Sequence, residues 1–169
     1  IKKPKAIIIC GSAIQTNYKE YNDIDIIIST KNKIEEREKK KIKKDIEEEG
    51  KSQKLDLDIQ IYLKKAIINQ YSSNPSLIYQ LKDSKIIYGN LTIPNKIILT
   101  NTDLKLKLDW SEGLKTNATG EEIYLALRNA FLVSLLINKK VDNYQLRNNL
   151  INLIGYDLLA KLKNNSLSK

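Results

Sequence analysis

Apolar positions in the first 90 residues fall into short runs of strand length. Ala6 to Cys10 is a continuous run rich in isoleucine, which is typical of a strand buried on both faces. Residues 24–29 contain a second apolar run, and residues 55–62 alternate between apolar and polar side chains, as a half-buried strand does. Ile86 to Tyr88 is a shorter run that ends at Gly89. The pattern therefore predicts four strands.

Helical spacing appears between the second and third of these strands. A helix is expected from about Lys33 to Glu49, with Ser29 or Thr30 as its N-cap and Gly50 at its C-terminal end. Its apolar stripe is thin, and its other positions carry charges of both signs, which indicates a solvated surface helix. The stripe consists of Ile34, Ile42 and Ile46.

Two shorter helices are expected after the third strand. Lys64 to Tyr71 is the first, and Ser76 to Lys82 follows Asn74-Pro75, a cap followed by proline at the first helical position. Helices and strands thus alternate through this part of the chain. The alternation predicts an α/β (α+β) fold with a small mixed sheet flanked by helices.

The remainder of the chain predicts a helical unit after an ambiguous segment. In residues 91–118, Ile97 to Leu99 is strand-like, and the leucines from Leu104 to Leu108 alternate with charged residues, which favours a strand but leaves a helix open. Thr119-Gly-Glu-Glu122 is a capping box that begins a helix to about Asn138. A weaker box at Asp142 begins another helix.

This pattern divides the chain into three predicted parts. Residues 1–90 form the α/β core, 91–118 connect it, and 119–169 form the C-terminal helical unit, whose last helices are separated by Gly155. The helical unit could close over a substrate, bind an acceptor, form a homodimer or simply pack. The chain has no initial methionine, so an N-terminal segment could be missing.

Composition narrows the possible chemistry. The chain has 169 residues, a formal net charge of +9 and no histidine, which excludes a Ser-His-Asp triad and a histidine-ligated zinc site. The single cysteine, Cys10, is expected to be a small buried residue. No membrane span or signal peptide is visible, so we expect a cytoplasmic protein. The lysine excess favours anionic partners such as nucleotides or nucleic acid. Because Ile, Asn and Lys dominate throughout the chain, the coding bias of an AT-rich genome or a heat-adapted composition explains the excess better than a binding face does.

Candidate chemistry gathers between the first two strands. Gly11-Ser12 follows the first strand and opens a helix-like stretch, and backbone N–H groups at such a turn can hold phosphate. Asp23 and Asp25 precede and begin the second strand on one face, roughly 6.5 Å apart. Two adjacent carboxylates repel each other, and a divalent cation between them would relieve this repulsion.

The segment from Gly11-Ser12 to Asp23-Ile24-Asp25 resembles the signature of the DNA polymerase beta-type nucleotidyltransferase superfamily. Asn74-Pro75, the helix-like run after it and Ile86-Ile87-Tyr88-Gly89 resemble a segment that small stand-alone members often carry. That family has a third carboxylate on a later strand. Asp56 and Asp58 both lie on one face of the predicted third strand, so periodicity does not choose between them. The string Leu57 to Ile61 is more similar to the family pattern around Asp58, and Asp56 is the fallback.

The resemblance implies a two-metal nucleotidyltransferase. Asp23, Asp25 and Asp58 would be the catalytic metal ligands for two Mg²⁺ ions, with Mn²⁺ as an alternative, and Gly11 and Ser12 would bind the nucleotide phosphates. The substrate would be an NTP, with ATP favoured, and the nucleoside monophosphate would pass to an acceptor hydroxyl on RNA, protein or a small molecule. In two-metal sites the ions lie ~3.5–4 Å apart and stabilise both the attacking and the leaving oxygen.

Two other functions stay open. Minimal nucleotidyltransferases of this size often act as antitoxins that adenylylate a HEPN-type toxin, which would make such a toxin the partner. A non-catalytic nucleotide- or nucleic-acid-binding subunit would keep the fold without turnover. The presence of all three carboxylates argues against the non-catalytic function, because buried charges without a use are costly.

Overall fold

The computed structural model describes residues 3–14, 23–112, 117–139 and 142–166. The chain forms two compact units. One comprises Ile1–Ser72 and Gln80–Ile97, and the other comprises Ser73–Tyr79 and Ile98–Lys169. The chain therefore passes between the units more than once, and the passage between Tyr79 and Gln80 falls within a helix. In the described residues, no helix is both long enough and apolar enough to span a membrane.

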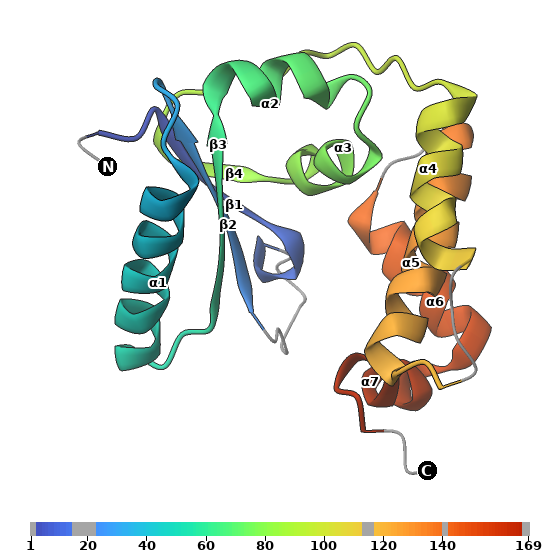
Figure 1. Ribbon diagram of the computed structural model, residues 1–169. Helices are drawn as coiled ribbons and strands as arrows, with labels where there is room; N and C mark the ends of the chain where they lie inside the picture. Colours follow the sequence, from blue (N-terminus) through green and yellow to red (C-terminus); the bar gives the residue numbers. More distant parts are fainter. Residues whose placement is uncertain (1–2, 15–22, 113–116, 140–141, 167–169) are drawn as a thin grey trace. The chain divides into compact units, whose positions relative to one another are not determined.

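A four-stranded mixed sheet with the order β3-β2-β1-β4 forms the first unit (Figure 1). Its strands are β1 (Ala6–Cys10), β2 (Ile24–Thr30), β3 (Leu57–Leu63) and β4 (Lys85–Gly89). β1 pairs antiparallel with both β2 and β4, whereas β2 and β3 run parallel. All four predicted strands form, which confirms the α/β class.

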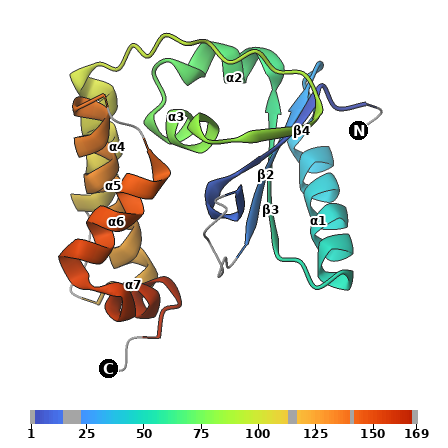
Figure 2. The same ribbon diagram turned by 180° about the vertical axis from the view of Figure 1, so that it is seen from behind.

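Helix α1 (Glu36–Ser52) lies alongside β3 in both views of the ribbon (Figures 1 and 2). The expected helix is confirmed, but its predicted cap is wrong. Ser29 and Thr30 are the last two residues of β2 and are buried, because β2 stays paired with β3 as far as Thr30. The N-cap is Glu35, which makes no side-chain capping bond.

Gly50 lies inside the last turn of α1 and not at its end. It is buried, and a Cβ atom there would lie 2.6 Å from Leu57 Cδ1. The close approach of the helix to β3, and not helix termination, explains the glycine.

The predicted helices after β3 are confirmed as α2 (Lys64–Tyr71) and α3 (Pro75–Lys82). Asn74 Oδ1 accepts a hydrogen bond of 3.1 Å from the Leu77 N–H, so the side chain caps α3 as expected. Proline fits the first helical position because no intrahelical bond needs its missing N–H.

Helix α4 (Asn101–Glu112) occupies the segment for which alternation favoured a strand, and that prediction is wrong. Residues 97–99 form no strand either. Thr100 and Asp103 cap the helix: the Thr100 hydroxyl donates to Asp103 Oδ2 at 2.8 Å, and the Asp103 N–H donates back to the Thr100 hydroxyl at 3.2 Å. Leu106 is 55% exposed, so the alternating leucines do not share one buried face.

The other helices of the second unit agree with their predicted signals. Helix α5 (Gly120–Ile137) begins with the complete capping box of Thr119 and Glu122. Helix α6 (Asn143–Ile154) begins after Asp142, whose carboxylate accepts from two backbone N–H groups. Gly155 then separates α6 from α7 (Tyr156–Lys163) with a φ of 81°.

Helix α5 is the centre of this unit and contacts α4, α6 and α7 (Figure 2). The buried apolar residues of α5, α6 and α7 recur at helical spacing and form the core. They are Ala126, Leu132, Val133, Leu135, Leu136, Leu146, Leu150, Leu159 and Leu162.

Candidate active site

Asp25 and Asp58 lie directly beside each other in the sheet. They are register partners on the parallel strands β2 and β3, so their side chains leave the same face. Neighbouring strands are about 4.8 Å apart, which brings two carboxylates together where each strand begins.

Asp23 and Asp56 precede β2 and β3, respectively, by one residue. The Asp56 carbonyl accepts the Ile24 N–H at 2.8 Å, which extends the pairing of the two strands, while the Asp56 side chain is exposed. The register therefore places Asp58, and not Asp56, beside Asp25. The catalytic role of Asp58 stays a prediction.

Gly11 brings its backbone directly against Asp25. It follows Cys10, the register partner of Asp25 on β1, and it has a φ of +72° that L side chains rarely adopt. A Cβ atom at this position would overlap the Asp25 carboxylate. Both the backbone conformation and the available space therefore call for glycine.

The predicted phosphate turn is a short 3-10 helix, η1 (Gly11–Ile14). The Ser12 side chain and residues 15–22 lie outside the described residues, as does the rest of the helix expected after the turn. Gly11 and the backbone of Ser12 are thus the described parts of the candidate phosphate site.

The Asp58 carboxylate belongs to a polar network at the edge of the sheet. Lys43 Nζ donates to Asp58 Oδ1 at 3.1 Å, and Gln60 Nε2 donates to Oδ2 at 3.4 Å. The Tyr62 hydroxyl donates to Gln60 Oε1 at 3.0 Å, and Lys43 also reaches Glu47 at 3.4 Å. The hydrogen bond to Asp58 raises the pKa of Lys43, which keeps its ammonium charged.

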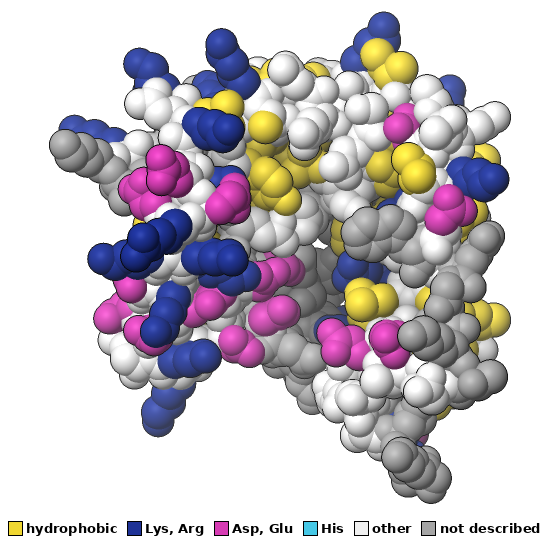
Figure 3. Space-filling model, viewed as in Figure 1, with side chains coloured by type: hydrophobic (Ala, Val, Ile, Leu, Met, Phe, Trp, Pro, Cys, Tyr) yellow, Lys and Arg dark blue, Asp and Glu magenta, His cyan; other side chains and the backbone are white. Residues whose placement is uncertain are grey.

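Lys43 is a site residue that the sequence did not reveal. Its neighbours on α1 alternate in charge, and Figure 3 shows lysines and acidic side chains mixed over this helix. The sequence therefore predicted one solvated face. Only the position of α1 beside β3 distinguishes Lys43 from the other lysines.

Cys10 is a buried thiol and not an activated nucleophile. Its side chain is fully buried, and its Sγ donates to the Asp25 carbonyl at 3.6 Å. Burial, and then the negative charges of Asp25 and Asp58, raise the pKa of Cys10 to about 12. The effect of both carboxylates on one thiol shows that negative charge is concentrated here.

Cys10 should make folding stability sensitive to high pH. Its pKa is raised on folding, so the stability from the neutral thiol is complete below pH 9 and is lost as the pH rises from 9.0 towards 12. We expect the free energy of unfolding to fall by about 1.4 kcal/mol per pH unit in this range, relative to Cys10→Ala. Urea titrations of both proteins at pH 8, 9 and 10 test this, and parallel pH dependences would contradict it.

Asp25 and Asp58 suit a hard divalent cation. Carboxylate oxygens are its preferred ligands, and Mg²⁺ is commonly held by one or two carboxylates together with water and substrate phosphates. Within the described ranges, no three Asp, Glu, Cys or His side chains form a close metal-binding group. The register pair is therefore the part of the predicted ligand set that this structure brings together, with Asp23 next to it in the chain.

Comparison with known proteins agrees with this arrangement. The family model described as Polymerase beta, Nucleotidyltransferase matches residues 1–90, which include β1 to β4 and all the candidate site residues. No curated protein and no solved structure matched the chain. Members of this family act on a nucleotide substrate and typically use divalent metal ions. The chain belongs to the polymerase beta nucleotidyltransferase family, and its general activity is nucleotidyl transfer.

Proposed function

We propose that this protein transfers a nucleoside monophosphate from an NTP, with ATP favoured, to an acceptor hydroxyl. The observation that carries the proposal is the register pair of Asp25 and Asp58 beside the backbone of Gly11. Negative charge at this point would attract a divalent cation, and a glycine lets phosphate approach the backbone closely.

In the proposed reaction, the acceptor oxygen forms a bond to the α-phosphorus of the NTP. The bond from that phosphorus to the bridging oxygen breaks, pyrophosphate leaves, and the hydroxyl proton passes to solvent. Bound Mg²⁺ would supply charge neutralisation at the phosphates and activation of the attacking hydroxyl.

The protein residues hold and orient these groups. Asp25, with Asp23, would hold the cation at the NTP, and Asp58 would serve the acceptor side. Lys43 and Gln60 each donate to one oxygen of Asp58 and so fix the orientation of its carboxylate. Preorganisation of this kind lowers the cost of reaching the transition state.

Label transfer identifies both the reaction and the acceptor. The protein would be incubated with each α-³²P-labelled NTP and Mg²⁺, with cell RNA, protein or small-molecule extract added separately. We expect label in one fraction only, dependent on Mg²⁺ and strongest with ATP. An excess of EDTA should abolish the transfer.

The outcome of the labelling experiment distinguishes the candidate functions from one another. Label on a protein would favour the antitoxin function, and a copurified HEPN-type toxin is the partner to test. A lack of transfer together with a lack of Mg²⁺-dependent nucleotide binding by calorimetry would favour a non-catalytic subunit. Transfer that persists in EDTA would contradict the metal-dependent mechanism.

A further inference from the structure

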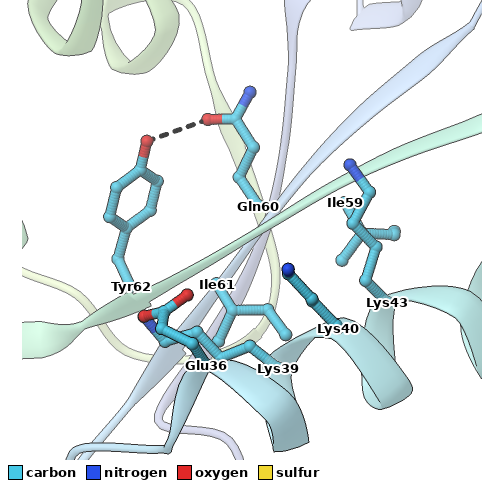
Figure 4. A pocket seen from close by; sticks show the side chains of 8 residues that line it. All are labelled: Glu36, Lys39, Lys40, Lys43, Ile59, Gln60, Ile61 and Tyr62. Atoms are coloured by element: carbon cyan, nitrogen blue, oxygen red, sulfur yellow. Dashed lines mark hydrogen bonds and ion pairs between the residues drawn. The ribbon is translucent and has the colours of Figure 1, made fainter.

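An open groove lies between α1 and the outer edge of β3 (Figure 4). Its volume is about 280 Å³, and residues from both elements line it. Ile59 and Ile61 supply the apolar part, and the remaining lining side chains are polar or charged. Those polar and charged residues are Glu36, Lys39, Lys40, Lys43, Gln60 and Tyr62.

The groove carries an excess of positive charge that the rest of α1 does not. Lys39, Lys40 and Lys43 recur at one helical face, and Glu36 is the acidic residue among those that line the groove. Lys43 is already paired with Asp58 and Glu47, so Lys39 and Lys40 supply the charge that a ligand could use. Figure 4 shows these lysines on the helix beside β3. Elsewhere on α1 the charges balance, as in the pair of Lys44 and Glu48 at 3.5 Å.

Lys43 stays engaged with Asp58 and Glu47, whereas the contact of Lys39 with a carboxylate is exchangeable. Lys39 Nζ lies 2.7 Å from Glu36 Oε1, whose side chain is 78% exposed. Exposed ion pairs contribute little, so an arriving phosphate can take over the ammonium. Lysine is a common phosphate partner because its ammonium is a compact charge with three donors.

The groove shares two side chains with the polar network around Asp58. Lys43 and Gln60 both line it, and both donate to the Asp58 carboxylate. Tyr62, which also lines the groove, donates its hydroxyl to the amide oxygen of Gln60 at 3.0 Å. A group bound in the groove would thus be one side chain away from Asp58.

We infer that this groove binds a phosphate group of the acceptor and so places the acceptor hydroxyl beside Asp58. This inference rests on the proposed function and adds the substrate class: an acceptor that carries phosphate next to its reacting hydroxyl. The volume of about 280 Å³ lies just below the usual range for small-molecule sites, so it suits a phosphate with part of its sugar rather than a larger ligand. The phosphate can come from an RNA strand or from a small sugar phosphate.

A matched pair of double variants tests the groove. Lys39→Gln with Lys40→Gln removes two charges from the groove, and Lys41→Gln with Lys44→Gln removes two charges from α1 outside it. The probes are a fluorescein-labelled single-stranded RNA, followed by anisotropy, and ribose 5-phosphate, followed by calorimetry. We expect the groove variant to bind one probe about tenfold more weakly, as loss of charge-assisted contacts implies. The control should change less than about twofold.

The two probes distinguish the sources of phosphate. Binding of RNA alone identifies a nucleic-acid acceptor, and binding of ribose 5-phosphate alone identifies a small-molecule acceptor. Equal weakening by the two double variants would show unspecific attraction to basic charge and would overturn the inference. Failure of both probes to bind the wild-type protein at millimolar concentration would overturn it as well.

Binding of Mg-ATP by the same variants separates this inference from the proposed function. We expect the groove variant to keep the wild-type affinity for Mg-ATP and to show a raised KM for the acceptor with little change in kcat. A wild-type protein that fails to bind Mg-ATP would refute the proposed function, whether or not the groove binds phosphate. Normal Mg-ATP binding by the groove variant, together with an unchanged KM for the acceptor, would refute only the inference that the groove binds the acceptor.

Discussion

Asp25→Asn is expected to reduce nucleotidyl transfer by at least about a hundredfold in a protein that still folds. The size follows from the loss of a metal ligand, since changing even the groups that support a ligand costs 10- to 100-fold. The fold should persist because asparagine keeps the shape of the side chain and removes the repulsion between Asp25 and its register partner Asp58. Binding of Mg-ATP should weaken as well.

Asp58→Asn should separate transfer from nucleotide binding. If Asp58 serves the acceptor side only, this variant loses transfer and largely keeps Mg-ATP affinity, because the lost interaction acts in the transition state. Asp56→Asn is the matched control: it removes the same charge two residues earlier, from an exposed side chain outside β3. Of the three variants, Asp56→Asn should show the smallest loss of nucleotidyl transfer.

Turnover, Mg-ATP affinity by calorimetry and urea unfolding of the three variants check these expectations together. An inactive Asp56→Asn with an active Asp58→Asn would move the third carboxylate by two residues. Normal transfer by both the Asp56→Asn and the Asp58→Asn proteins would show that neither residue is a third catalytic carboxylate. A marked loss of stability in Asp25→Asn would mean that this carboxylate has a structural role.

Gly11→Ala is expected to damage both the fold and the site. A side chain at this φ of +72° costs about 1–2 kcal/mol by itself, and the new Cβ would also overlap the Asp25 carboxylate. Asp25 must therefore move, and Mg²⁺-dependent ATP binding should fall with it. The sequence indicated only that phosphate could approach the backbone at Gly11, whereas the structure adds the displaced carboxylate.

Gly155→Ala provides the control for Gly11→Ala. Gly155 has a φ of +81°, and a Cβ there would meet no heavy atom within 4 Å, so this variant carries backbone strain alone. Both variants should lose stability in urea unfolding, but only Gly11→Ala should lose ATP affinity. Normal ATP binding by a folded Gly11→Ala protein would show that the backbone next to Asp25 does not contribute to the site.

Local patterns in the sequence were sufficient for most elements of the fold. The isoleucine run at Ala6–Cys10 and the alternation around Asp58 predicted strands that form, because burial and pleat act over a few neighbouring residues. The capping box at Thr119 predicted the start of α5 for the same reason. The sequence also determined the family, since its signature residues lie close together in the chain.

The tertiary structure decided the points that depend on distant residues. Alternation favoured a strand at 104–108, but this segment forms helix α4, which packs against α5. Ser29 and Thr30 resembled a helix cap, yet pairing with β3 keeps them in β2. In each case one local pattern fits two structures, and contacts with distant residues select between them.

The arrangement of the candidate site likewise required the fold. The two-residue period of a strand places Asp56 and Asp58 on the same face, so the sequence does not choose between them. Only the register of β3 against β2 brings Asp58 beside Asp25. Lys43 is one of several lysines in a charged helix, and only its position across from β3 connects it with Asp58. The sequence determined which residues could do the chemistry. Their partners were decided by strand register and helix placement, because these bring together side chains that are far apart in the chain.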